Sequence, residues 1–124
     1  MKRLIMDLDN TITRTENSDY DNAQPIKEVI QKLHEYKQQG FEIIISSSRN
    51  MRTYEANIGK INIHTLPTII NWLNRHNVPY DEIYVGKPWC GHDGFYVDDR
   101  SIRPDEFVRL SYDEIRGLTK MDRK

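Results

Sequence analysis

The chain has 124 residues, a net charge of −1 and 37% hydrophobic residues. Its isoelectric point is near 6.4 and its mean hydropathy is −0.76. This length suits a single domain with a real hydrophobic core. The near-neutral charge argues against nucleic-acid binding and against a membrane-surface protein, since both need a basic patch.

Cys90 is the only cysteine, which rules out an intrachain disulfide and favours a reducing compartment. Because the N-terminal apolar run is far too short for a signal core or a membrane span, we expect a soluble, cytoplasmic protein.

The first apolar run, residues 4–6, predicts a short buried strand that stops at Asp7. Asp9 follows two positions later, so both carboxylates crowd one strand end, whether the strand continues or turns. Two carboxylates that close require a cation between them or a shared proton. The alternative is that Asp7 to Thr11 form an ordinary turn, which these residue types also favour.

The polar stretch 12–24 predicts a loop or small flap. Pro25 fits the first position of a helix whose apolar stripe runs to Tyr36, and Gly40 fits its end. Residues 41–46 follow as a second strand. Its uninterrupted isoleucine run is typical of a parallel strand covered on both faces, so these elements form a strand–helix–strand unit.

Residues 50–64 predict a short helical turn and a loop, and Thr65 is expected to cap a second helix with Pro67 in its first turn. We expect Trp72 to cover the edge of that helix's apolar stripe, and residues 82–85 to form a third strand.

Further strands are expected at 95–97 and, at the sheet edge, at 107–110. A capping box of Ser111 and Glu114 predicts a last helix that stops near Gly117. We expect one domain over residues 1–124, with 12–24 as the flap and 118–124 as a frayed tail.

Each predicted core strand leads into a chemically reactive residue. The strands are followed in turn by Asp7 with Asp9, by Ser47, by Lys87, and by Asp98 with Asp99. Carboxyl ends of parallel strands share one sheet edge, where α/β proteins bind ligands. Four such coincidences indicate one site.

This order of motifs closely resembles the haloacid dehalogenase-like superfamily. Residues 7–11, Asp-Leu-Asp-Asn-Thr, match its DxDxT motif, and Asn10 replaces the glycine of many members. Ser47 matches its Ser/Thr motif, Lys87 its lysine, and residues 96–99 its acidic motif. The resemblance spans about residues 3–101 and implies a three-layer, Rossmann-like α/β fold with a mostly parallel sheet.

The resemblance also implies phosphoryl transfer. Asp7 would be the nucleophile that forms an aspartyl-phosphate, and Asp9 the general acid and base. Asp9 indicates a phosphatase, since family dehalogenases lack this second acid. Mg²⁺ would be held by Asp7, the backbone carbonyl of Asp9, and Asp98.

Donors to the phosphoryl oxygens would be the Ser47 hydroxyl, the Lys87 ammonium and backbone N–H groups, including that of Ser48. Thr11 would support the first motif, and Asp99 would orient Lys87 or a metal-bound water. Each residue also has an ordinary role available, as a turn residue or a surface charge.

The gaps between motifs hold no cap domain, which implies an open site for a bulky substrate or one completed by a neighbouring subunit. Segments 47–52 and 86–91 resemble a bacterial subgroup linked to capsule and surface-polysaccharide synthesis, which implies a phosphorylated sugar or related precursor. Arg49, Arg52, Trp89 and His92 are then candidate substrate contacts; loop packing and solvated charge are the alternative.

Cys90 and His92 resemble the start of a zinc loop, but the chain has no second cysteine to complete a four-ligand site. A phospho-receiver domain is rejected, because its acceptor aspartate would follow the middle strand, which here ends in serines. Two alternatives stay open. One is a polynucleotide 3′-phosphatase, which the near-neutral charge disfavours. The other is a non-catalytic, metal-binding interaction module. We expect a small phosphorylated substrate, no membrane partner and possible self-association.

Overall fold

A computed structural model describes residues 1–16 and 19–119. The chain divides into two compact units, 1–89 and 90–124, which are described separately below as unit 1 and unit 2. The expectation of a single domain stays a prediction. Of the frayed tail expected at 118–124, residues 118 and 119 are helical, and the remainder lies outside the described residues.

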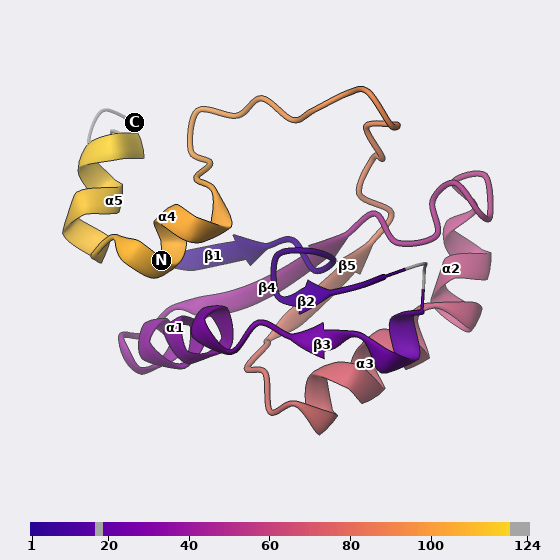
Figure 1. Ribbon diagram of the computed structural model, residues 1–124, viewed down its shortest axis with the longest axis horizontal. Helices are drawn as coiled ribbons and strands as arrows, with labels where there is room; N and C mark the ends of the chain where they lie inside the picture. Colours follow the sequence, from indigo (N-terminus) through magenta and orange to yellow (C-terminus); the bar gives the residue numbers. More distant parts are fainter. Residues whose placement is uncertain (17–18, 120–124) are drawn as a thin grey trace. The chain divides into compact units, whose positions relative to one another are not determined.

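Unit 1 is built on a parallel sheet with strand order β1–β4–β5 (Figure 1). Its strands are β1 (Arg3–Met6), β4 (Glu42–Ser47) and β5 (Glu82–Val85). Met6 pairs with Ile45, and Ser47 pairs with Val85. This register aligns the carboxyl ends of all three strands at one edge, as the sequence predicted.

The flap between β1 and β4 contains a second, small antiparallel sheet. It pairs β2 (Thr13–Arg14) with β3 (Gln24–Pro25), and the one-turn helix η1 (Tyr20–Asn22) lies between them. The indole Nε1 of buried Trp72 donates a 2.8 Å hydrogen bond to the Ala23 carbonyl. Trp72 therefore ties α3 to the flap, a contact beyond its expected role of covering the edge of the helix's apolar stripe.

Helix α1 (Lys27–Gln38) packs on β4 and buries Val29, Ile30, Leu33 and Tyr36. The prediction that Pro25 opens this helix was wrong, because Pro25 belongs to β3 and Ile26 is the N-cap. Gly40 has φ +92°, which confirms its role as the helix-ending glycine.

Two helices connect β4 to β5. Helix α3 (Leu66–Arg75) was predicted, with Pro67 in its first turn, whereas α2 (Ile58–His64) lies where only a short helical turn and a loop were expected. Thr65 lies between them in a helical conformation, and its hydroxyl donates to the Asn50 side chain (2.7 Å) instead of capping α3. The described residues contain no cap domain inserted between the strands, as expected.

Both crossovers step the same way across the sheet, so right-handed connections place α1, α2 and α3 on one face. The opposite face carries Ile5 and Tyr84, which are 55% and 54% exposed. The described part of unit 1 therefore supplies two of the three layers expected from the resemblance. The mixed α/β class and the parallel sheet are confirmed.

Unit 2 differs most from the sequence-based expectation. Residues 95–97 do not form a strand, and Phe95 and Val97 are 80% and 87% exposed. A strand forms only when a neighbouring strand satisfies its backbone hydrogen bonds. The edge strand expected at 107–110 was also wrong, because α4 (Pro104–Arg109) occupies most of that range.

The last helix, α5 (Tyr112–Thr119), begins as predicted. The Ser111 N–H donates to the Glu114 carboxylate (2.9 Å), and the Glu114 N–H donates to the Ser111 hydroxyl (3.2 Å). This reciprocal pair confirms the capping box, although the helix continues two residues past Gly117.

Candidate active site

The turn after β1 holds Asp7 and Asp9 at the end of the strand. The carbonyl of Leu8 accepts hydrogen bonds from the N–H groups of Thr11, Ile12 and Thr13, at 2.9–3.2 Å. Leu8 and Ile12 are buried and anchor the turn in the core. Asn10 has φ +60°, a left-handed conformation that glycine and asparagine adopt most readily. The replacement of glycine at this position therefore fits the turn.

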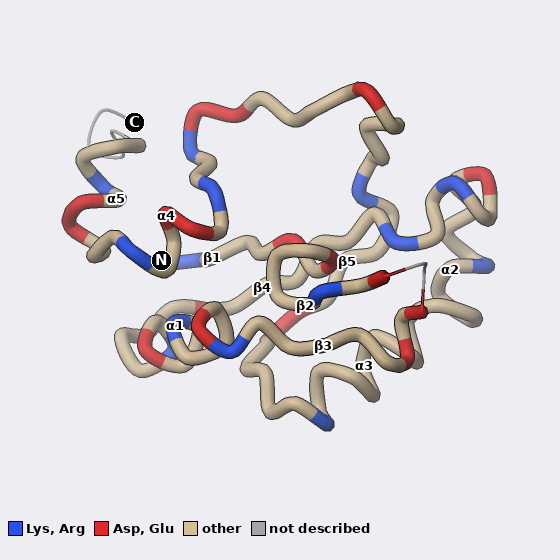
Figure 2. Tube along the Cα trace, viewed as in Figure 1, with Lys and Arg blue, Asp and Glu red and all other residues tan. Residues whose placement is uncertain are grey.

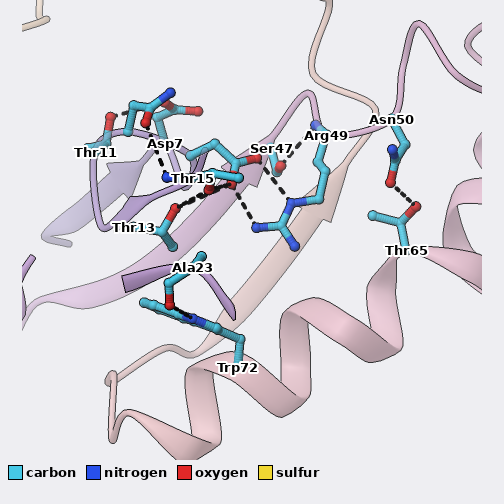
Figure 3. Close-up of polar contacts among 12 residues, drawn as sticks. Asp7, Thr11, Thr13, Thr15, Ala23, Ser47, Arg49, Asn50, Thr65 and Trp72 are labelled. Atoms are coloured by element: carbon cyan, nitrogen blue, oxygen red, sulfur yellow. Dashed lines mark hydrogen bonds and ion pairs between the residues drawn. The ribbon is translucent and has the colours of Figure 1, made fainter. Parts of the chain in front are cut away.

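Asp7 lies between a hydroxyl and an ammonium group, and Figure 3 shows the hydroxyl of Thr11 beside it. The Thr11 hydroxyl donates to Oδ2 (3.0 Å), and Lys87 Nζ lies 3.5 Å from Oδ1. The Asp7 side chain is 36% exposed, so solvent reaches this carboxylate although both of its oxygens have a partner.

Lys87 reaches Asp7 because of the geometry at the end of β5. The Lys87 N–H donates to the Ser47 carbonyl (3.1 Å), which extends the β4–β5 pairing by one step. Gly86 precedes it with φ +87°, and a Cβ at this position would collide with Ile58 Cδ1. Ser47 itself is buried, and its hydroxyl accepts a hydrogen bond from the Arg49 N–H (3.0 Å).

Asp9 is bound by a buried arginine, marked by the dashed lines at Arg49 in Figure 3. Arg49 Nε donates to Oδ2 (3.0 Å) and Nη2 donates to Oδ1 (2.7 Å), a two-pronged pair. The hydroxyls of Thr13 and Thr15 also donate to Oδ1, at 3.3 and 3.2 Å. The Asp9 side chain is 23% exposed, whereas that of Arg49 is 1% exposed.

The repulsion expected between Asp7 and Asp9 is therefore relieved in unit 1 by two separate cations. Lys87 neutralises the first carboxylate and Arg49 the second. The sequence predicted instead one cation between the two carboxylates or a proton shared by them.

Sequence reasoning missed one contributor to this arrangement, Tyr20. Its ring centroid lies 4.1 Å from Arg49 Cζ, in a cation–π contact. The only signal in the sequence was a single aromatic residue within an otherwise polar flap.

The predicted substrate contacts do not all lie at the surface. Arg49 is buried against Asp9, and its role in substrate binding stays a prediction. Arg52 and Trp89 are exposed and close, with Arg52 Cζ 5.8 Å from the Trp89 ring centroid. His92 is exposed in unit 2. Ser48, half-buried, accepts a backbone hydrogen bond from Met51 through its carbonyl.

The fourth motif belongs to unit 2. The Asp98 carboxylate accepts a hydrogen bond from the Arg100 N–H (2.9 Å), and Asp98 and Asp99 are exposed. The described residues contain no group of three or more His, Cys, Asp or Glu side chains arranged to hold a metal. The roles assigned to Asp98 and Asp99 stay predictions, as does any role for Cys90 and His92.

Within the same described residues, no helix is long and apolar enough to cross a membrane.

The sequence pattern of the haloacid dehalogenase-like hydrolases matches residues 4–81, well over half of the chain. No curated protein matches the chain. A crystal structure of a target protein from Vibrio cholerae is 61% identical, covers 98% of this chain and 99% of its own, and superposes with a TM-score of 0.95. A chain of a Pnkp1/Rnl/Hen1 complex is 23% identical with a TM-score of 0.51, covering 87% of this chain and 33% of its own, a likeness of fold alone.

Strand ends that present Asp7, Asp9, Ser47 and Lys87 on a parallel sheet, together with this match, define the class of protein. The chain belongs to the haloacid dehalogenase-like hydrolase family.

Proposed function

We propose that this hydrolase is a Mg²⁺-dependent phosphomonoesterase that acts through an aspartyl-phosphate on Asp7. One observation carries the proposal. Asp7 is a partly exposed carboxylate between Thr11 and Lys87, and Asp9 is fixed two residues away by Arg49.

In the first step, a carboxylate oxygen of Asp7 attacks phosphorus and the ester P–O bond breaks. The electron pair of that bond leaves with the alkoxide, which takes a proton from the carboxylic acid of Asp9. In the second step, Asp9 removes a proton from water. The resulting hydroxide attacks phosphorus, breaks the bond to Asp7 and releases inorganic phosphate.

We infer that Lys87 and Ser47 stabilise the charge on the transferring phosphoryl group. Lys87 Nζ lies beside the attacking carboxylate, and Ser47 ends the neighbouring strand. Such positioned donors supply much of the catalysis in phosphoryl transfer.

The donor set suits magnesium, because it consists of hard oxygens. Asp7 and the backbone carbonyl of Asp9 would hold the ion in unit 1, and Asp98 stays the further ligand that the family resemblance implies. This assignment leaves the Asp9 side chain to Arg49, in agreement with their contact. Bound Mg²⁺ would supply charge neutralisation at the phosphoryl group.

The substrate we propose is a phosphorylated sugar or related precursor of surface-polysaccharide synthesis. The exposed Arg52–Trp89 pair supports a sugar, since a Trp face can stack on a sugar ring while an Arg binds its hydroxyls or charge. The role in polysaccharide synthesis rests on the likeness of segments 47–52 and 86–91 to that subgroup. With no cap between the strands, a small substrate would need a neighbouring subunit or loop closure to exclude water.

The polynucleotide 3′-phosphatase alternative has the same chemistry. Lys and Arg residues alternate with Asp and Glu along much of the trace in Figure 2, and the net charge is −1. A nucleic-acid groove needs a concentration of positive charge, so the sugar substrate is preferred. The single Cys90 supports a reducing, cytoplasmic location.

Phosphate release from p-nitrophenyl phosphate, with and without Mg²⁺, tests the proposal. We expect Mg²⁺-dependent turnover by the wild type and loss of at least about 10³-fold in Asp7→Asn, since an amide is not a nucleophile here. Thr53→Ala, an exposed change, is the folded control. Equal turnover by Asp7→Asn would contradict the nucleophile assignment. A folded wild type inactive on aryl and sugar phosphates alike would favour the non-catalytic module.

A further inference from the structure

We propose that Tyr20 and Arg49 are positioning residues for Asp9, and that the flap fixes the general acid by clamping this arginine. The inference rests on the proposed function, because it concerns how Asp9 acts in that reaction.

The first observation is the burial of Arg49. Its side chain is 1% exposed, which is rare for arginine unless its charge is paired. Nε and Nη2 both donate to Asp9, so a single planar group determines the direction of both carboxyl oxygens. The Arg49 N–H also donates to the Ser47 hydroxyl, which ties the arginine backbone to the end of β4.

The second observation is the contact between the Arg49 guanidinium group and the Tyr20 ring. The Tyr20 ring lies 4.1 Å from Arg49 Cζ, and Nη1 is buried without a hydrogen-bond partner among the described residues. The two hydrogen bonds to Asp9 oppose rotation of the guanidinium group. The Tyr20 ring adds to that restraint, because moving the guanidinium group away from the ring would weaken the cation–π contact.

The third observation is how Tyr20 is held in place. Tyr20 begins η1, and the Ala23 N–H at the end of η1 donates back to the Tyr20 carbonyl (3.4 Å). The Ala23 carbonyl in turn accepts the buried Trp72 indole hydrogen bond. The position of the ring is therefore fixed by α3, through a hydrogen bond that crosses from the core to the flap.

The flap also contacts Asp9 directly, through two threonine hydroxyls. Thr13 and Thr15 donate to the carboxyl oxygen that Nη2 contacts. The flap therefore restrains Asp9 in two ways. Two of its hydroxyls bind the carboxylate directly, and its Tyr20 ring contacts the arginine that binds the same carboxylate. A general acid must lie within hydrogen-bond reach of the leaving oxygen, so loosening this enclosure should weaken proton delivery specifically.

Leaving-group dependence separates such a defect from a general loss of structure. p-Nitrophenolate leaves without help from an acid, whereas the alkoxide of benzyl phosphate needs a proton. Because Asp9 also serves as the base in the second step, which both substrates share, the comparison uses kcat/KM, which reports the first step alone. Asp9→Asn sets the limit, a loss of kcat/KM of roughly 10²–10⁴-fold on benzyl phosphate and much less on p-nitrophenyl phosphate. We expect Tyr20→Leu to lower kcat/KM for benzyl phosphate by about tenfold or more and to leave kcat/KM for p-nitrophenyl phosphate within about threefold, a fraction of the full acid effect.

Tyr20→Phe is the matched control, because it keeps the ring and removes only the hydroxyl; we expect wild-type kinetics on both substrates. Tyr20→Met is a second test variant should Tyr20→Leu fold poorly. An equal loss of kcat/KM on both substrates in a folded Tyr20→Leu or Tyr20→Met protein would overturn the proposal. So would an increase on benzyl phosphate, which would mean that Arg49 restrains Asp9 from acting.

A measurement without turnover distinguishes this proposal from the proposed function. NMR of the arginine side chains, with the Arg49 signal assigned by its absence in Arg49→Lys, reports rotation of the guanidinium group. We expect slow rotation in the wild type and Tyr20→Phe, and fast rotation in Tyr20→Leu and Asp9→Asn. Unchanged slow rotation in Tyr20→Leu would overturn the clamp, whether or not the protein is a phosphatase. A wild type that shows the clamp but hydrolyses neither substrate would overturn the proposed function alone.

Discussion

At the scale of single residues, the site depends on how two neighbouring carboxylates acquire different partners. Asp7 contacts Lys87, while Asp9 turns toward Arg49. This separation gives two chemically identical groups different partners, a buried guanidinium group for Asp9 and a partly exposed ammonium group for Asp7.

The sequence predicted Asp7, Asp9, Ser47 and Lys87 as one cluster, because polar residues that end successive parallel strands must meet. It did not predict the partner of Asp9. Arg49 lies in a polar run, Ser-Ser-Ser-Arg-Asn, which suggests an exposed loop. Its burial comes from contacts with Tyr20 and Asp9, 29 and 40 positions away, which no local pattern records.

The left-handed conformation of Asn10 leads to a stability prediction. We expect Asn10→Ala to be less stable than Asn10→Gly by about 1 kcal/mol, because a Cβ is disfavoured at φ +60°. Urea denaturation followed by circular dichroism measures the difference. Both variants lose the contact between the Asn10 side chain and the Thr15 N–H, so the comparison isolates the backbone effect. Equal stability of the two variants would show that the turn relaxes to another conformation.

At the scale of elements, prediction succeeded where apolar residues formed an uninterrupted run or a clear helical stripe, as in β4 and α3. It failed where a short apolar run was ambiguous between strand and helix. Residues 107–110 show this. Pro104, Asp105 and Glu106 just before them are helix-start signals, and α4 continues from these residues through most of the short apolar run. Only a short helical turn was expected near α2, because its residues, apart from its isoleucines, are polar or glycine.

Asp81 joins three elements next to the sheet. Asp81 lies just before β5, and its carboxylate accepts hydrogen bonds from Lys37 of α1 and from the Ile43 N–H of β4, both at 2.8 Å. The Asp81 N–H in turn donates a hydrogen bond to the Ile43 carbonyl. The hydrogen bond from Lys37, and then that from Ile43, hold the pKa of Asp81 below its ordinary value of 3.8.

We therefore expect Asp81→Asn to lower the free energy of unfolding by about 1 kcal/mol at pH 7, mainly through weaker hydrogen bonds, since the ion pair is partly exposed. Because the native pKa is lowered, the unfolded chain takes up its proton at a higher pH than the folded one. The contribution of Asp81 is complete well above pH 3.8 and is lost as the pH falls below that value through the native pKa.

Urea denaturation from pH 7 to pH 3 measures this difference. Asp93→Asn, at an exposed turn position, is the matched control and should show no comparable loss at any pH. A difference between wild type and Asp81→Asn that stays constant down to pH 3 would contradict the electrostatic explanation.

At the scale of the whole molecule, the carboxyl edge of the parallel sheet brings together motifs that are far apart in the sequence. Positions 7, 47 and 87 are far apart in sequence, yet the parallel register of β1, β4 and β5 aligns the three strand ends. This part of the fold could be predicted because strand ends follow directly from local apolar runs. The fourth motif could not, because residues 95–97 become a strand only if they find a partner, and their own sequence does not determine one.

In the reaction that we propose, Asp7 carries the phosphoryl group. The most direct test is to trap that intermediate in Asp9→Asn, where hydrolysis of the aspartyl-phosphate is slowed by the loss of its general base. The variant is mixed with radiolabelled p-nitrophenyl phosphate and Mg²⁺, quenched in acid and digested, and the labelled peptide is identified by mass spectrometry. We predict label on Asp7, released by hydroxylamine as expected for an acyl phosphate and missing from Asp7→Asn/Asp9→Asn. Label on another residue, or label that persists without the Asp7 carboxylate, would contradict the claim.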